Sequence, residues 1–139
     1  MKILKIIVVC ILLVLFVFYW IRPLANPDIT EYYPPIIYSD ETYFSITIPV
    51  EIDLKDGKRS FTELFNAYGF SGNGPSIEQV VRANTHFASV QFDSEGDAFV
   101  MYTSNEEQYL SVLNELRCME EIACLKKWVK TARWVLIKE

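Results

Sequence analysis

Three carboxylates occupy alternate positions in the stretch ASVQFDSEGDAFVMY, residues 88–102. Asp93, Glu95 and Asp97 could hold a calcium ion, or two of them could act as an acid–base pair. A calcium loop of the EF-hand type that began at Asp93 would require glycine at its sixth position and glutamate at its twelfth. The chain has alanine and serine there, which excludes this type of site. The apolar runs on both sides favour the turn of a β-hairpin, and a turn seldom perturbs carboxylate pKa values as catalysis requires.

Other reactive side chains do not form a recognisable catalytic or metal site either. The single histidine, His86, has no nucleophile motif near it in the sequence. Cys118 and Cys124 are not a CxxC pair and have no second pair to complete a zinc site. The glycine-rich residues 69–74 lack the lysine and the preceding strand of a phosphate-binding loop. We therefore expect no enzymatic activity, no metal ion and no cofactor.

The two later cysteines pose a geometric question. On one continuous helix, residues six apart are separated by about 9 Å of rise and about 240° of rotation. A disulfide between Cys118 and Cys124 would exceed the Cα separation limit of about 7 Å unless the helix breaks between them. The sequence leaves two alternatives open, a disulfide across a helix break or two buried thiols.

The N-terminal segment predicts a membrane anchor over residues 1–21. Residues 6–21 are an uninterrupted apolar run, close to the length that crosses the hydrocarbon core of a bilayer as a helix. A cleaved signal peptide is the competing interpretation, but the run ends in bulky residues rather than small ones. Tyr19 and Trp20 fit the interface of a membrane.

The flanking charges predict the orientation of that anchor. Lys2 and Lys5 precede the apolar run, and only Arg22 follows it closely. The positive-inside rule then places the N-terminus in the cytoplasm and the rest of the chain outside. We expect a single-pass protein of the bacterial inner membrane with its C-terminal domain in the periplasm.

A proline-rich segment, residues 22–42, follows the anchor and contains four of the six prolines. Proline fixes φ and removes an amide donor, so this segment is expected to be an extended tether. Its aromatic and aliphatic residues could alternatively lie along the domain as an extra edge segment. We expect the folded domain to span residues 43–139.

The pattern within that domain predicts an α+β fold, a small antiparallel sheet packed with helices. Apolar residues alternate over 44–52, with Pro49 favouring an edge position. A helix is expected from Ser60, with Glu63 completing a capping box and Gly69 ending the helix. Further elements are a loop at 72–75, a helix capped by Ser76, a hairpin with Gly96 at positive φ and a helix capped by Thr103 or Ser104. The C-terminal stretch LKKWVKTARWVLIKE has helical spacing, but its end, WVLI, could equally be a closing strand.

The charge distribution constrains the partners. Residues 22–139 hold 11 Lys and Arg (13 minus Lys2 and Lys5) and 18 Asp and Glu, a formal net charge of −7. Such acidity argues against nucleic acid as a partner, because phosphate binding needs clustered basic residues. It favours either attraction of a basic protein or ordinary solubility. If a protein binds, the candidate contact residues are those near the two central loops: Tyr68, Phe70, Asn73, Asp93, Glu95 and Asp97.

Two stretches, LFNAYGFSGNGPSIEQVV and VQFDSEGDAFVMYTSNEEQYLSVL, resemble the fifty-first class of bacterial polymorphic-toxin immunity proteins. The resemblance covers about residues 60–130. The residues that match the pattern are Phe65, Gly69, Gly72, Asn73, Gly74, Phe92, Asp93, Glu95 and Phe99. Pro75 and Ile77 depart from it, since the family has two aromatic residues after Asn-Gly.

The resemblance implies a protein without catalysis that binds and neutralises a cognate toxin delivered by another cell. Together with the predicted anchor, it implies protection against a toxin that acts in the periplasm. The alternative is a single-span accessory or structural subunit of a bacterial envelope complex. An inhibitor should work when separated from its anchor, whereas such a subunit should depend on the span itself.

Overall fold

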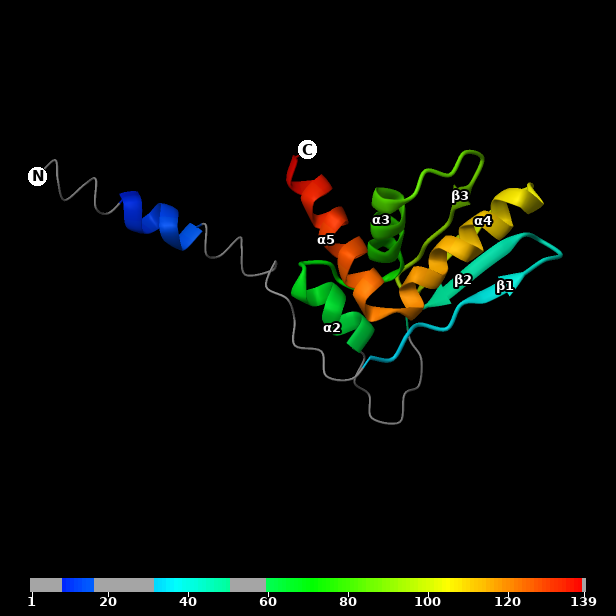
Figure 1. The fold of residues 1–139 in the computed structure, drawn as a ribbon, viewed down its shortest axis with the longest axis horizontal. Helices are drawn as coiled ribbons and strands as arrows, with labels where there is room; N and C mark the ends of the chain where they lie inside the picture. The colour runs from blue at the N-terminus through cyan, green and yellow to red at the C-terminus, as the bar shows by residue number, and fades with distance from the viewer. Residues whose placement is uncertain (1–8, 17–31, 51–59, 139) are drawn as a thin grey trace, which may run out of the picture.

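The computed structural model describes residues 9–16, 32–50 and 60–138. In this part of the chain, four antiparallel strands form one sheet: β1 (Tyr38–Asp40), β2 (Ser45–Pro49), β3 (Gln91–Phe92) and β4 (Ala98–Tyr102), in the order β1-β2-β4-β3 (Figure 1). The helices that follow residue 59 are α2 (Ser60–Ala67), α3 (Gly74–Asn84), α4 (Glu106–Leu116), the short 3-10 helix η2 (Arg117–Glu120) and α5 (Ile122–Lys138). The α+β class with a small antiparallel sheet is confirmed.

The two central strands, β2 and β4, have one buried and one partly exposed face. Side chains alternate between the two faces of a strand, and the burial of both strands follows that period. The buried face consists of Ile46, Ile48, Phe99 and Met101. These residues share one core with apolar side chains of the helices, among them Leu64, Phe65, Ile77, Val80, Val112, Leu125 and Val129. The opposite face of the sheet, which carries Thr47 and Val100, remains partly exposed.

The proposed tether corresponds in part to folded structure. Tyr32 and Ile37 pack against the core, and Pro35 is buried. Residues 38–40 form the edge strand β1, in which Tyr38 pairs with Thr47 of β2. These contacts and β1 lie before the domain start predicted at residue 43, and the edge segment that was the alternative to a tether is a strand at residues 38–40. The remainder of the predicted tether lies outside the described residues.

Pro49 ends an inner strand rather than occupying an edge strand. β2 lies between β1 and β4, but β1 pairs only as far as Thr47, two residues before the proline. The amide of Val50 donates to the carbonyl of Asp97 on the β4 side, at 2.7 Å. Since amides alternate in direction along a strand, the nitrogen of Pro49 faces the β1 side of β2. β1 does not extend that far, so no pairing is lost through the missing donor.

Gly69 ends α2 as predicted. Its φ of +81° is the left-handed conformation that glycine adopts without strain. The amide of Phe70 then donates to the carbonyl of Phe65 at 3.0 Å, which closes the helix end. Ser60 starts α2 as expected, but its side chain lies outside the described atoms, so the capping box with Glu63 stays a prediction.

α3 begins three residues earlier than predicted, since its cap lies at residue 73 rather than 76. The N-cap is Asn73, whose side chain accepts a hydrogen bond from the Ser76 amide at 3.0 Å. Gly74 and Pro75 are therefore helical rather than part of a loop. Proline fits the first turn of a helix, because the amide it lacks would have no intrahelical partner there.

α4 is also capped by an asparagine. Asn105 accepts from the amide of Gln108 at 3.0 Å, which corrects the prediction of Thr103 or Ser104. Thr103 instead donates to the carbonyl of Ser89 at 3.0 Å and accepts from the Asn105 amide. This hydroxyl ties the end of β4 to the loop before β3.

The predicted hairpin is present, with β3 and β4 paired and a bridge between Glu95 and Ala98. Gly96 lies at its tip, but it is not among the described residues with positive φ, so that part of the prediction is wrong. The C-terminal stretch is the helix α5, which removes the strand alternative.

The described residues include no helix that is long and apolar enough to span a membrane. Of the predicted anchor, residues 9–16 are described and are helical. The other residues of the apolar run, on both sides of this segment, lie outside the described part of the chain.

Candidate functional site

The hairpin turn that carries the three carboxylates, termed the acidic turn, is held by hydrogen bonds between backbone groups. The amide of Asp93 donates to the carbonyl of Val100 at 3.0 Å, and the amide of Glu95 donates to that of Ala98 at 2.9 Å. Asp93, Glu95 and Asp97 are all exposed. Among the described residues, no group of His, Cys, Asp and Glu is arranged to hold a metal ion. The turn presents its carboxylates to solvent, where they can attract a positively charged partner.

The glycine-rich loop packs directly against this turn. A Cβ built on Gly74 would lie 2.0 Å from the carbonyl oxygen of Ala98 and 2.1 Å from that of Glu95. Only glycine permits so close an approach of α3 to the hairpin. The two stretches that carry the family resemblance therefore form one unit in space, with Asn73 and Gly74 at its centre.

Asn73 has a structural role in that unit. Its side-chain oxygen accepts from the Ser76 amide and also lies 2.7 Å from the Ser76 hydroxyl. Gly72, just before it, has a φ of +72°. The side chain of Asn73 therefore caps the start of α3. Its Oδ1 atom is already hydrogen-bonded to Ser76, so it is not free to bind a partner.

The predicted exposure of Tyr68 and Phe70 is wrong. Tyr68 is fully buried and Phe70 is 6% exposed. Phe70 packs edge-on against Phe65, with ring centroids 6.2 Å apart. The sequence suggested a loop because Gly69 separates the two aromatic residues, but the turn directs both rings into the core. Burial raises the pKa of Tyr68.

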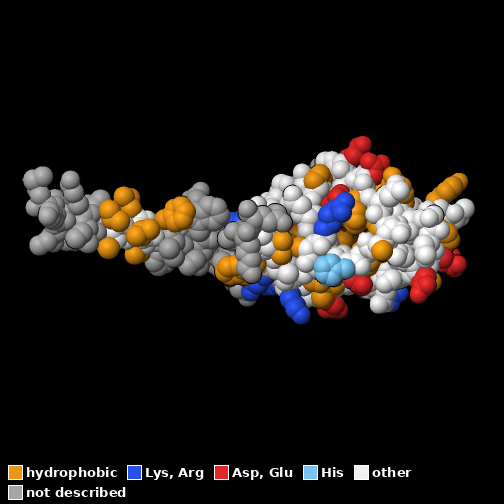
Figure 2. All heavy atoms as spheres, turned by 90° about the horizontal axis from the view of Figure 1, so that it is seen from above, with side chains coloured by type: hydrophobic (Ala, Val, Ile, Leu, Met, Phe, Trp, Pro, Cys, Tyr) orange, Lys and Arg blue, Asp and Glu red, His pale blue; other side chains and the backbone are white. Residues whose placement is uncertain are grey.

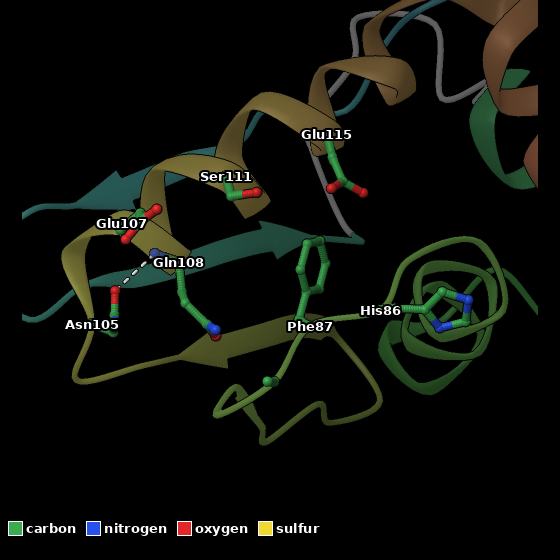
Figure 3. A pocket seen from close by; sticks show the side chains of 8 residues that line it. His86, Phe87, Asn105, Glu107, Gln108, Ser111 and Glu115 are labelled. Atoms are coloured by element: carbon green, nitrogen blue, oxygen red, sulfur yellow. Dashed lines mark hydrogen bonds between the residues drawn. The ribbon is translucent and has the colours of Figure 1, made fainter.

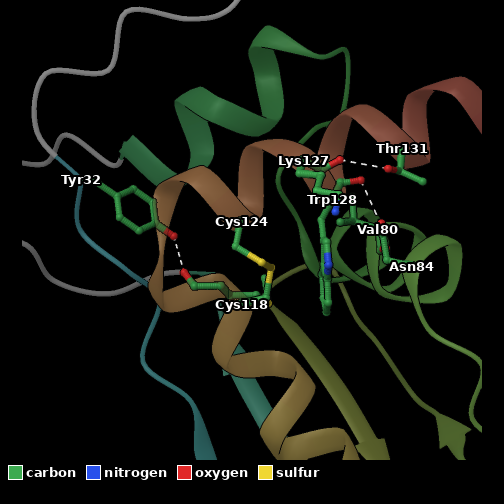
Figure 4. The surroundings of a disulfide bond; sticks show 9 residues. Tyr32, Val80, Asn84, Cys118, Cys124, Lys127, Trp128 and Thr131 are labelled. Carbon is green, nitrogen blue, oxygen red and sulfur yellow. Dashed lines mark hydrogen bonds between the residues drawn. A yellow bond between two sulfur atoms is a disulfide. The ribbon is translucent and has the colours of Figure 1, made fainter.

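Cys118 and Cys124 form a disulfide, with Cα atoms 5.3 Å apart (Figure 4). The helix break that this disulfide requires is present, because the 3-10 helix η2 separates α4 from α5. The short loop closed by this bond also holds the N-terminal part of the domain. The hydroxyl of Tyr32 donates to the carbonyl of Met119 within the loop.

A polar groove runs between α4 and the loop that follows α3 (Figure 3). Its volume is about 330 Å³. It is lined by His86, Phe87, Ala88, Asn105, Glu107, Gln108, Ser111 and Glu115. The side chains at positions 107, 111 and 115 share one face of α4, because they are spaced by four residues. The groove has the acidic character of the hairpin turn and could receive a basic side chain.

The open face of the sheet contains residues that the sequence argument missed. Tyr38 is 58% exposed and Tyr102 is 39% exposed. Strand register places both on the face opposite the core, since Tyr38 pairs with Thr47, and Tyr102 pairs with Ser45. The alternation of Tyr102 with the apolar Met101 in β4 could have predicted that Tyr102 lies on the exposed face. The exposure of Tyr38 on a strand was missed because the residue was assigned to the tether.

Figure 2 shows acidic side chains over the middle and the right-hand end of the domain, while most basic ones lie nearer its left-hand end. The sequence agrees, since residues 83–116 contain six acids and no Lys or Arg, while α5 contains five basic residues. The acidic turn, the groove and the open sheet face all belong to the acidic part. Comparison with protein-family models, curated proteins and solved structures finds no match for this chain.

Proposed function

We propose that this protein is an immunity protein that binds a cognate antibacterial toxin and neutralises it by one-to-one occlusion. The observation that carries the proposal is the contact of Gly74 with the backbone of the acidic hairpin turn. It joins the two stretches that resemble the immunity class into one rigid acidic unit. A preorganised surface of this kind favours binding, because less conformational entropy is lost on association.

The mechanism of neutralisation requires no chemistry from this chain. The exposed carboxylates would steer a basic toxin into an encounter complex, and electrostatic attraction of this kind raises association rates. The bound domain would then cover the catalytic or membrane-active surface of the toxin. Nucleic acid is not proposed as a partner, since the acidic surface would repel phosphate.

We propose the bacterial periplasm as the place of action, with residues 6–21 as an anchor in the inner membrane. The disulfide supports an oxidising compartment, because such bonds persist mainly outside the cytoplasm. A periplasmic reporter fused after residue 139 should be active, and a cytoplasmic reporter at the same point should be inactive. The reverse pattern would overturn this location.

Calorimetry of the full chain in detergent with the product of the adjacent gene tests the function. We expect a one-to-one complex with a nanomolar dissociation constant, and protection from growth arrest when both genes are expressed together. A folded neighbouring protein that neither binds nor arrests growth would contradict the proposal and favour the envelope-subunit alternative. In that case, function should depend on residues 6–21 rather than on the domain.

A further inference from the structure

The face of the sheet that points away from the helices has a defined chemical pattern. Strand register places Tyr38, Thr47 and Val100 in one row across β1, β2 and β4. A second row contains Asp40, Ser45, Tyr102 and Gln91. This set of residues is termed the open sheet face. It combines exposed tyrosines with small and hydroxyl-bearing side chains.

Acidic residues lie on and around the open sheet face. Asp40 belongs to the second row, and Asp93 continues the first row, because its amide pairs with the carbonyl of Val100. Glu41 follows β1, while Glu95 and Asp97 lie in the hairpin turn at the start of β4. Residues 32–50 and 83–116, which include all four strands, contain no Lys or Arg. The strands and the turn that form this face therefore contribute acidic side chains and no basic ones.

The two tyrosines are spaced as separate anchor points. Two strand spacings and two residues along the strand separate Tyr38 from Tyr102, roughly 12 Å. Tyrosine is enriched among the residues that dominate binding energy at protein interfaces. Its ring also attracts the ammonium or guanidinium of a basic partner. The face thus offers two aromatic anchors inside an acidic rim.

We propose that the open sheet face is the docking surface for the toxin, and that the toxin presents a basic surface to it. This inference rests on the proposed immunity function and specifies its interface. Lys and Arg side chains of the toxin contact the rings of Tyr38 and Tyr102 and the carboxylates of Asp40 and Asp93. The groove beside α4 is the competing acidic site, but the exposed rings of Tyr38 and Tyr102 favour the sheet.

Paired substitutions in the full chain test the docking surface. Tyr38→Thr with Tyr102→Thr removes both rings and puts β-branched side chains, which favour strands, in their place. It should raise the dissociation constant for the adjacent gene product at least about tenfold. Trp134→Ala is the matched control, because Trp134 is 53% exposed and lies on α5, outside the sheet. Its dissociation constant should change less than about twofold.

A second pair of variants keeps the test decisive if the tyrosine variant does not fold. Thr47→Lys places a positive charge at the centre of the open sheet face and should weaken binding at least about tenfold, while Ser111→Lys places it in the α4 groove and should have little effect. Strong binding by the wild type with no loss in Thr47→Lys would overturn the docking surface and leave the immunity function standing. A loss only in Ser111→Lys would move the interface to the groove. Absence of binding by the wild type would overturn both proposals.

Discussion

Gly74 contacts the backbone of Glu95 so closely that a Cβ on Gly74 would lie 2.1 Å from the Glu95 carbonyl oxygen. The contact joins the start of α3 to the hairpin turn, two parts of the chain about twenty residues apart. Neither partner can move away easily, because Gly74 is in the first turn of a capped helix and Glu95 is paired with Ala98. The acidic turn therefore has a fixed position on the domain.

Replacement of Gly74 by alanine should destabilise the fold by about 1–3 kcal/mol, the range expected when extra atoms are forced into a well-packed interior. Gly96→Ala is the control, since a Cβ at Gly96 meets no atom within 4 Å and φ there is not positive. We expect that variant to stay within about 0.5 kcal/mol of the wild type. Urea unfolding followed by tryptophan fluorescence measures both, and equal losses would contradict the close-contact explanation.

The acidic turn should determine the rate of toxin capture. Replacing Asp93, Glu95 and Asp97 together by serine should lower the association rate constant about tenfold at low salt, with a smaller effect at high salt. Stopped-flow mixing with the adjacent gene product measures the rate.

The control for this experiment removes the same number of charges from α4. Glu106, Glu107 and Glu115 are replaced by glutamine, which is compatible with the helix. The net charge of this variant changes by the same amount as that of the turn variant. We expect a smaller decrease than for the turn. An unchanged rate in the turn variant would exclude it as a steering surface, and equal decreases would attribute steering to net charge alone.

The disulfide should contribute measurably to stability. The loop that it closes spans a sequence separation of six, for which the chain-entropy relation gives about 2 kcal/mol. Dithiothreitol should therefore lower the unfolding midpoint of the wild type. The double variant Cys118→Ser, Cys124→Ser should start near the reduced value and show no response to the reductant. A wild type that does not respond, with its thiols shown to be reduced, would contradict a stabilising role.

Periodic features were predictable from the sequence because they depend on repeated apolar positions. The alternation that buries Ile46 and Ile48 and the helical stripe that buries Leu125 and Val129 are examples. Each signal is the sum of several residues, so one competing interaction does not erase it. β2, the hairpin of β3 and β4, and the helical spacing of the C-terminal stretch follow from such patterns.

Local choices between similar residues were not predictable. Asn73 and Ser76 are both good N-caps, and the close packing of Gly74 against the hairpin selects the earlier one. β1 was hidden because two prolines precede it and because its three residues are all exposed. Its existence depends on pairing with β2, a long-range contact that a local pattern does not contain. The exposed surface of Tyr38 was missed for the same reason.

The partly buried Tyr32 and the fully buried Tyr68 should respond differently to loss of the hydroxyl group. The hydroxyl of Tyr32 donates to the carbonyl of Met119, so Tyr32→Phe should cost about 1 kcal/mol at neutral pH. The buried hydroxyl of Tyr68 has no hydrogen-bond partner among the described residues, so Tyr68→Phe should be neutral or slightly stabilising. Urea unfolding at pH 7 measures both, and a larger loss for Tyr68→Phe would contradict this assignment.

The same tyrosines predict a loss of stability at alkaline pH. Burial, and in second place the Glu121 carboxylate, raise the pKa of Tyr32, and burial raises the pKa of Tyr68. An unfolded tyrosine ionises near about pH 10. Above that pH the unfolded chain releases protons that the folded chain retains, so the free energy of unfolding falls as pH rises. Below about pH 9 these two tyrosines should not change the free energy of unfolding.

Tyr32→Phe should show a smaller decrease in the free energy of unfolding between about pH 9 and 11 than the wild type, because one of the two groups is absent. Parallel curves for the two proteins would show that the folded domain does not hold Tyr32 in its neutral form.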